Sequence, residues 1–169
     1  METWEAEDDR TAAIEICQSF ASCLNKCGPG LISPQWIEPT CQLTLQILEK
    51  KAPSQIDPEA DEDEETEDSS EYESVLISAA MDLVGAMAYV LCDSFMTPMR
   101  QFLPLLCKYY SPGRSVTDRA TAIGSLGEIT VNMKRAITPF TQDILAILSH
   151  AVGDEDASCL LYTSPSPRD

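Results

Sequence analysis

The sequence predicts an all-α protein, a right-handed solenoid of about three stacked helical hairpins that is interrupted by a disordered acidic insert. Three observations carry this prediction. Apolar residues make up 44% of the 169 residues, and Ala, Leu, Met, Glu and Gln, which favour helix, dominate the apolar stretches. These apolar residues recur at spacings of three and four, as they do along one face of a helix. The same pattern then returns further along the chain, which is typical of repeat proteins.

Six helical segments are predicted, arranged in three pairs. They span Asp9–Lys26 and Ser33–Lys51, then Glu71–Cys92 and Thr97–Tyr110, then Ser115–Lys134 and Thr138–Val152. Gly28-Pro29-Gly30 ends the first segment, because glycine and proline cannot continue a helix. Ser115 begins a pattern typical of a capping box. Pro104 lies inside the fourth segment and is expected to kink or shorten it.

An internal repeat relates the three pairs. The apolar stripe of the first helix, Ala13, Cys17, Phe20 and Leu24, matches Ala80, Val84, Met87 and Leu91 and then Ala122, Leu126, Ile129 and Met133. The second helix of each pair opens with a hydroxyl residue and proline, at Ser33-Pro34, Thr97-Pro98 and Thr138-Pro139. Once about 20 insert residues are removed, the repeat length falls within the 40–47 residues of HEAT repeats. A plain helical bundle with chance similarity is the alternative.

The predicted division of the chain follows these repeats. Residues 1–52, 72–113 and 114–158 form HEAT-like helical pairs, 53–71 form the acidic disordered insert, and 159–169 form a disordered tail. The tail is similar to one reading-frame translation of a transposase adapter used in sequencing libraries, so we expect a sequencing-adapter artefact. If so, the natural chain continues past Ser158. The alternative is a genuine flexible Ser/Pro tail.

Charge is the most informative feature for function. The formal net charge is −17, which disfavours binding to nucleic acids and anionic membranes and favours basic partners. Eleven acidic residues and no basic residue lie between positions 57 and 73: Asp57, Glu59, Asp61, Glu62, Asp63, Glu64, Glu65, Glu67, Asp68, Glu71 and Glu73. Their mutual repulsion predicts disorder. They offer a counter-surface for Lys/Arg-rich segments, or else form a solvated insertion that only keeps the protein soluble.

The residue pattern predicts no enzyme, no cofactor and no metal site. No Cys or Ser is paired with a base, and Gly124-Ser125-Leu126-Gly127 lacks the lysine of a phosphate-binding loop. Cys23 and Cys27 are spaced like two metal ligands, but a second pair is missing, so most of the seven cysteines are expected to be small buried thiols. With no run of 18 consecutive apolar residues, no membrane-spanning segment is expected.

Residues 9–157 resemble importin-4-type karyopherins of the importin-beta superfamily. The segments that carry the resemblance are Glu71–Val84, Phe102–Leu106 and Ser115–Gly124, together with the acidic insert before Glu71-Tyr72 and the helix that ends near Ile47–Pro53. The resemblance implies a receptor that shuttles between cytoplasm and nucleus. Such receptors carry basic cargo, typically ribosomal proteins and histones, through nuclear pores.

In that family Ran-GTP releases the cargo and nucleoporins guide the receptor, so both are expected partners of the full-length protein. The eleven acidic residues of 57–73 are then the predicted cargo-binding residues. The Ran-binding N-terminal repeats of the family have no counterpart here. Two other functions stay open: a HEAT-repeat scaffold in a multiprotein complex, and an acidic histone chaperone.

Overall fold

The computed structural model describes residues 7–30, 32–56 and 67–153. Within these residues all regular secondary structure is helical, and there is no strand. The chain divides into two units, Met1–Val90 and Leu91–Asp169. The prediction of an all-α fold built from helical hairpins is confirmed.

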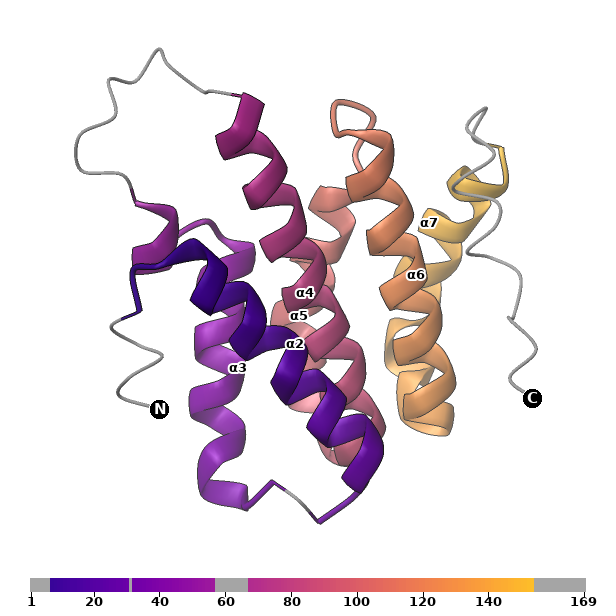
Figure 1. The fold of residues 1–169 in the computed structure, drawn as a ribbon. Coiled ribbons are helices and arrows are strands. Elements are labelled where there is room, and N and C mark those ends of the chain that lie inside the picture. Colours follow the sequence, from indigo (N-terminus) through magenta and orange to yellow (C-terminus); the bar gives the residue numbers. More distant parts are fainter. Residues whose placement is uncertain (1–6, 31, 57–66, 154–169) are drawn as a thin grey trace. The chain divides into compact units, whose positions relative to one another are not determined.

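The first unit contains α2 (Arg10–Cys27), α3 (Pro34–Leu48), the short 3-10 helix η1 (Pro53–Gln55) and α4 (Glu67–Leu91). Figure 1 shows α2 and α3 as an antiparallel hairpin. Asp9 caps α2, since its side chain accepts a hydrogen bond from the backbone N–H of Ala12. Gly28 ends α2 in a conformation with φ of 69°, which glycine adopts at little cost.

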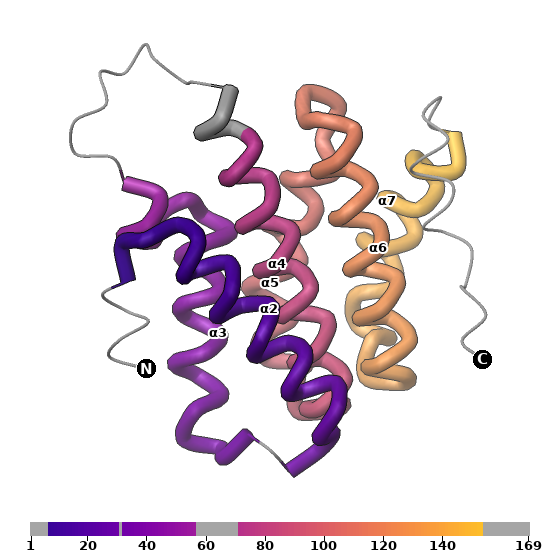
Figure 2. The backbone as a smooth tube through the Cα atoms, viewed as in Figure 1, coloured from indigo at the N-terminus to yellow at the C-terminus, as the bar shows by residue number. Residues whose placement is uncertain are grey.

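The second unit contains η2 (Cys92–Phe95), α5 (Met96–Tyr109), α6 (Val116–Met133), η3 (Lys134–Phe140) and α7 (Thr141–Val152). The backbone path in Figure 2 shows α6 and α7 following each other through the tighter turns of η3. Ser115 caps α6 by accepting a hydrogen bond from the N–H of Asp118, which confirms the predicted helix start. The rings of Phe95 and Phe102 stack in the core of the second unit, with centroids 5.9 Å apart.

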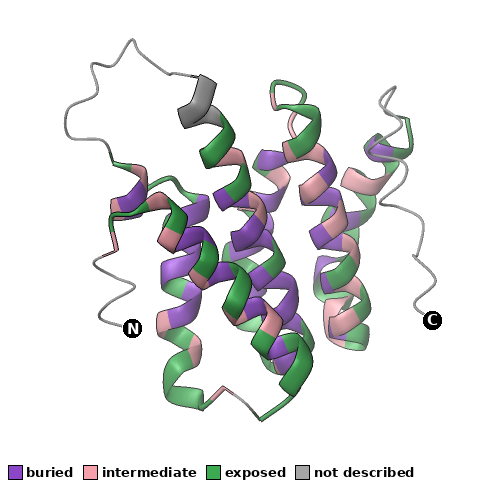
Figure 3. Ribbon diagram, viewed as in Figure 1, coloured by how far each residue is buried: buried purple, intermediate pink, exposed green. Residues whose placement is uncertain are grey.

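The repeated apolar stripe is the buried face of three helices. Its members are buried in α2 (Ala13, Cys17, Leu24), α4 (Ala80, Val84, Met87) and α6 (Ala122, Leu126, Ile129, Met133). Phe20 and Leu91 of the same stripe are half-buried. Figure 3 shows buried positions along one side of α2 and α6, with exposed positions on the other. The predicted repeat therefore marks the faces that pack.

Two helices begin at other residues than the hydroxyl–proline pairs predict. α3 does begin at Pro34, but Pro98 lies inside the first turn of α5, and Pro139 lies within η3, before α7 begins. Proline fits any position of a first turn, because the N–H groups there have no partner within the helix. Two of the three hydroxyl–proline pairs thus lie at or in the first turn of an α-helix, and the third lies just before one.

Two further expectations differ from the structure. Pro104 was expected to kink or shorten its helix, but it does not shorten α5, which runs on to Tyr109, one residue before the predicted end. α4 begins at Glu67, four residues before the predicted Glu71, and Pro53–Gln55 forms a 3-10 turn. The insert was predicted to be disordered over 53–71, which is wrong for its described ends, because 53–55 and 67–71 are helical. Residues 57–66 of the insert and the tail (159–169) lie outside the described residues, and the predicted division into five segments remains a prediction.

One helical segment has the length and composition of a membrane span, although no such segment was expected from the sequence. Among the described residues, Glu71–Tyr109 contains an 18-residue window with a mean hydropathy of 2.0, which by length and composition is enough to cross a membrane. Burial within the protein covers 67% of that window. Core helices of soluble proteins can have the same length and composition, because their apolar side chains are covered by protein.

Candidate functional site: the flanks of the acidic insert

The chain leaves α3 through a Schellman motif. Lys50 adopts a left-handed conformation with φ of 61°. Its N–H donates to the carbonyl of Ile47 at 3.0 Å, and the N–H of Lys51 donates to the carbonyl of Gln46 at 2.8 Å. These bonds satisfy carbonyls that a helix end leaves without partners. The motif ends α3 abruptly and directs the chain into η1.

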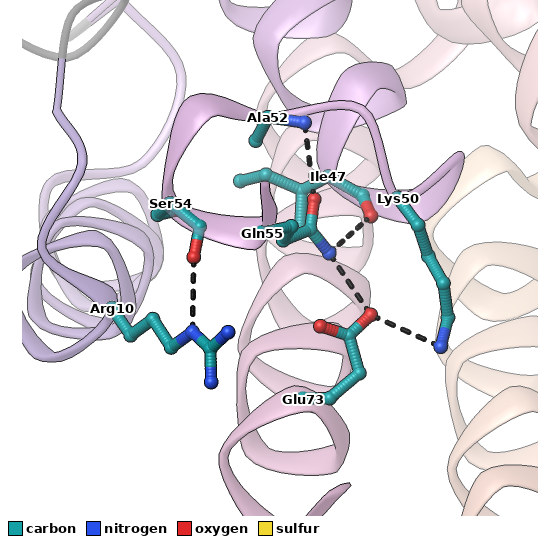
Figure 4. A network of polar contacts seen from close by, with 7 residues as sticks. All are labelled: Arg10, Ile47, Lys50, Ala52, Ser54, Gln55 and Glu73. Atoms are coloured by element: carbon teal, nitrogen blue, oxygen red, sulfur yellow. Dashed lines mark hydrogen bonds and ion pairs between the residues drawn. The ribbon is translucent and has the colours of Figure 1, made fainter. Parts of the chain in front are cut away.

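Gln55 joins the two described flanks of the insert (Figure 4). Its Nε2 donates to the carbonyl of Ile47 at 3.0 Å and to Oε1 of Glu73 at 3.1 Å. Its Oε1 accepts from the N–H of Ala52 at 3.2 Å. The side-chain amide therefore connects α3, η1 and α4, and it fixes where the chain departs before position 57 relative to where α4 begins.

Lys50 reinforces this junction. Its Nζ lies 3.2 Å from the same Oε1 of Glu73, and the two side chains are 45% and 24% exposed. A partly exposed ion pair of this kind is worth about 0–1 kcal/mol. Its main effect is therefore to orient the Glu73 carboxylate toward the chain itself. We call Lys50, Gln55 and Glu73 the flank clamp.

Arg10 ties α2 to the same region. Its Nε donates to the carbonyl of Ser54 at 3.2 Å, and Ser54 is buried. A cavity of about 10 Å³ lies beside this contact, lined by residues of α2, α3 and η1 that include Ala13, Leu43 and Ser54. That volume holds about one water molecule. The junction is therefore a packed support and not a pocket for a small molecule.

Seven of the eleven predicted cargo-binding residues, Asp57, Glu59, Asp61, Glu62, Asp63, Glu64 and Glu65, lie outside the described residues. Glu67 and Asp68 lie in the first turns of α4. Glu71 is exposed, while Glu73 is half-buried and belongs to the flank clamp. Glu73 is therefore paired within the chain, and its assignment to the cargo-binding residues stays a prediction, as it does for the other ten.

Sequence reasoning missed a second exposed surface, on the outer face of α4. Its residues are Glu71, Tyr72, Val75, Asp82 and Tyr89, and all five are exposed. We call them the α4 stripe. The spacings of four, seven and seven from Glu71 through Val75 and Asp82 to Tyr89 place these four positions on one helical face. The same helical periodicity that predicts the buried face of α4 also places these residues on the opposite face.

The described thiols differ widely in exposure. Cys17 and Cys41 are buried, Cys92 and Cys107 are half-buried, and Cys23 and Cys27 are exposed on α2. The expectation that most cysteines are small buried thiols is therefore wrong for the described ones, of which only Cys17 and Cys41 are buried. Burial raises the pKa of Cys17 and of Cys41 to about 12, with the Glu38 charge adding to the effect at Cys41. Burial also raises the pKa of Cys107, helped by Asp143.

Cys17, Cys41 and Cys107 are poor nucleophiles, because the raised pKa disfavours the thiolate, which is the reactive form. Within the described ranges, no group of three or more His, Cys, Asp or Glu side chains could hold a metal ion.

The chain is similar to two curated proteins, and no protein-family model matches it. The protein named "Probable importin subunit beta-4" from Schizosaccharomyces pombe is 32% identical over 124 residues, which cover 69% of this chain and 12% of that protein. "Importin-4" from Homo sapiens is 26% identical over 158 residues, which cover 92% of this chain and 14% of that protein. This chain thus spans about an eighth of the length of these relatives.

Proposed function

From the similarity of this chain to importin-4 proteins, we propose that it contributes a surface for basic cargo to a nuclear transport receptor. Its all-α hairpin fold is that of HEAT repeats. One observation carries the proposal: eleven carboxylates and no basic residue lie between positions 57 and 73. The flank clamp supports it, because the two described flanks of this acidic run are tied to each other and to α3.

The physical role of the acidic run is long-range attraction. A dense block of carboxylates raises the local concentration of Lys/Arg-rich segments and speeds their encounter with the protein. Salt weakens this attraction, because the screening length falls to about 8 Å at physiological ionic strength. Binding through this surface is therefore strongly salt-dependent.

The finer parts of the proposal follow the family. Ribosomal proteins and histones are the proposed cargo, Ran-GTP the proposed release factor, and nucleoporins the proposed guides of the full-length protein. The proposed location is shuttling between cytoplasm and nucleus. The receptor acts by binding and release and not by catalysis.

An acidic histone chaperone is the second candidate, because the same charge density suits histone tails without any release factor. A HEAT-repeat scaffold in a multiprotein complex is a third. Ran-GTP separates them: it dissociates basic cargo from a full-length import receptor, whereas a chaperone or a scaffold keeps its partner.

The experiment compares two five-residue neutralisations with equal net charge. In the first, Asp61, Glu62, Asp63, Glu64 and Glu65 become the corresponding amides. In the second, the same change is made at Glu15, Glu38, Glu49, Asp93 and Asp143, which are exposed in other helices and turns. Fluorescence anisotropy with a labelled lysine-rich histone-tail peptide, at 50 and 200 mM salt, measures both.

We expect the insert variant to bind at least tenfold more weakly at 50 mM salt and to lose most of the salt dependence. The second variant should stay within about threefold of the parent chain, since it keeps the local charge block. Equal weakening of binding in both variants would mean that the insert acts only through the net charge of the chain and is not a specific cargo contact. Unchanged binding in the insert variant would remove it as the cargo contact.

A further inference from the structure

The α4 stripe has a composition that helix stability does not explain. Val75 and Tyr89 are 42% and 40% exposed and Tyr72 is 48% exposed. β-branched and aromatic residues are weaker helix formers than Ala, Lys or Glu, so an outer helix face gains nothing from them. The opposite face is the fully buried one, with Leu76, Ala80 and Val84 at most 1% exposed. The exposed apolar positions therefore do not belong to the core.

The charge of this helix has one sign. α4 carries no Lys or Arg along its whole length, and the stripe adds the carboxylates of Glu71 and Asp82 to two tyrosine rings. Carboxylates pair with Lys and Arg, and the face of a tyrosine ring attracts the same cations. Both kinds of group in the stripe thus favour one partner, a cationic side chain with an apolar stem.

The dimensions of the stripe define the shape of that partner. Glu71 and Tyr89 lie 18 residues apart in one continuous helix, which corresponds to about 27 Å. An extended chain covers that distance with about eight residues. The near end of the stripe lies close to the flank clamp, since Glu73 is in the same turn as Glu71 and Tyr72.

Tyr89 marks the far end, beside the end of α2. Its hydroxyl lies 4.0 Å from the position that a Cβ on Gly28 would occupy. The hydroxyl is thus directed toward the α2 end, while 40% of the residue remains exposed to solvent. Rigid aromatic anchors of this kind lose little conformational entropy when they bind a partner.

We propose that the α4 stripe is a docking surface for an extended segment of about eight residues rich in arginine. The proposal rests on the proposed function for the basic nature of the partner, but it places the contact on a rigid helix face. The carboxylates of Glu71 and Asp82 pair with guanidinium groups. The rings of Tyr72 and Tyr89 stack on them, and Val75 contacts their apolar stems.

The test is a charge reversal with a matched control. Glu71→Lys with Asp82→Lys is compared with Glu15→Lys with Asp93→Lys, since both pairs of carboxylates are exposed and both changes alter the net charge equally. The probes are labelled octa-arginine and octa-lysine peptides, measured by anisotropy with the whole 169-residue chain. Circular dichroism confirms that each variant keeps its helix content.

We expect the stripe reversal to weaken octa-arginine binding at least tenfold and the control reversal by less than threefold. Tyr72→Leu with Tyr89→Leu should weaken octa-arginine about threefold or more, whereas the two Tyr→Phe changes, which keep the rings, should not. Octa-lysine should respond less to the tyrosine changes, because arginine stacks better on aromatic rings.

The outcomes separate this inference from the proposed function. If only the insert neutralisation weakens binding, the stripe is not a docking surface, while the basic-cargo function stands. If the parent chain binds neither peptide, both fail. If sedimentation shows that the parent chain is a dimer and the stripe reversal makes it a monomer, the face belongs to a second copy and this inference is overturned.

Discussion

Cys17 and Cys41 are the described side chains whose acid–base behaviour changes most on folding. Both are buried, at 0% and 2% exposure. Burial disfavours the charged thiolate, which raises the pKa of each thiol from 9.0 to about 12. Between these values the folded chain keeps the two protons while the unfolded chain loses them.

This difference predicts a loss of stability in alkali. Because unfolding releases protons above pH 9, the free energy of unfolding should fall by about 1 kcal/mol for each thiol between pH 9 and pH 10. Urea unfolding of the parent chain and of the Cys17→Ala/Cys41→Ala variant at pH 8, 9 and 10 measures the effect. We expect the parent to lose about 2 kcal/mol more than the variant; the same loss in both would contradict the assigned cause.

At the scale of single elements, the sequence predicts where one helix ends but not where three others end. α2 ends at a glycine with positive φ, as its sequence predicts. α3, α4 and α6 are followed by Lys50, Cys92 and Lys134, which adopt positive φ without being glycine. A left-handed conformation costs an ordinary L-residue about 1–2 kcal/mol, so packing of the helices must compensate for this strain.

Lys134 offers a direct test of that strain. It is exposed, with φ of 52° and ψ of −117° at the end of α6. Lys134→Gly should raise the free energy of unfolding by about 0.5–1 kcal/mol, once the greater freedom of glycine in the unfolded chain is subtracted. Lys134→Ala removes the same charge but keeps the strain, so it should give no gain. Urea unfolding measures both, and an alanine variant as stable as the glycine variant would refute the argument.

The whole molecule is dominated by its net charge of −17. Two ion pairs of the described residues, Lys50–Glu73 and Lys51–Glu49, are partly exposed and contribute little stability that salt could remove. With so large a net charge, we expect repulsion among carboxylates to be the larger electrostatic effect, and it opposes the compact state.

Added salt should accordingly stabilise the fold. We expect the thermal midpoint to rise by about 2–4 °C between 20 and 300 mM NaCl, which corresponds to about 1 kcal/mol for a chain of this size. The five-residue insert neutralisation lowers the net charge to −12, so its midpoint should rise less with salt. Scanning calorimetry measures both chains; a midpoint that falls with salt would mean that attractive pairs outweigh the repulsion.

The local features of this protein were readable from its residues. The stripes from Ala13 to Met133, the glycine that ends α2 and the serine that caps α6 depend on helical periodicity and on single turns. Neighbours in the sequence are sufficient to specify such features. For the same reason the all-α class and the hairpin repeat were predicted correctly, although the first residues of α5 and α7 were not.

The clamp at the flanks of the insert required the tertiary structure. Glu73 was expected to bind cargo with the other ten acidic residues, yet it contacts Lys50 and Gln55, which are 23 and 18 residues away. Composition assigns every carboxylate of a charge run the same role. Only the packing of α3, η1 and α4 distinguishes Glu73, which is paired within the chain, from Glu71, which is exposed. That contact depends on residues far apart in the chain.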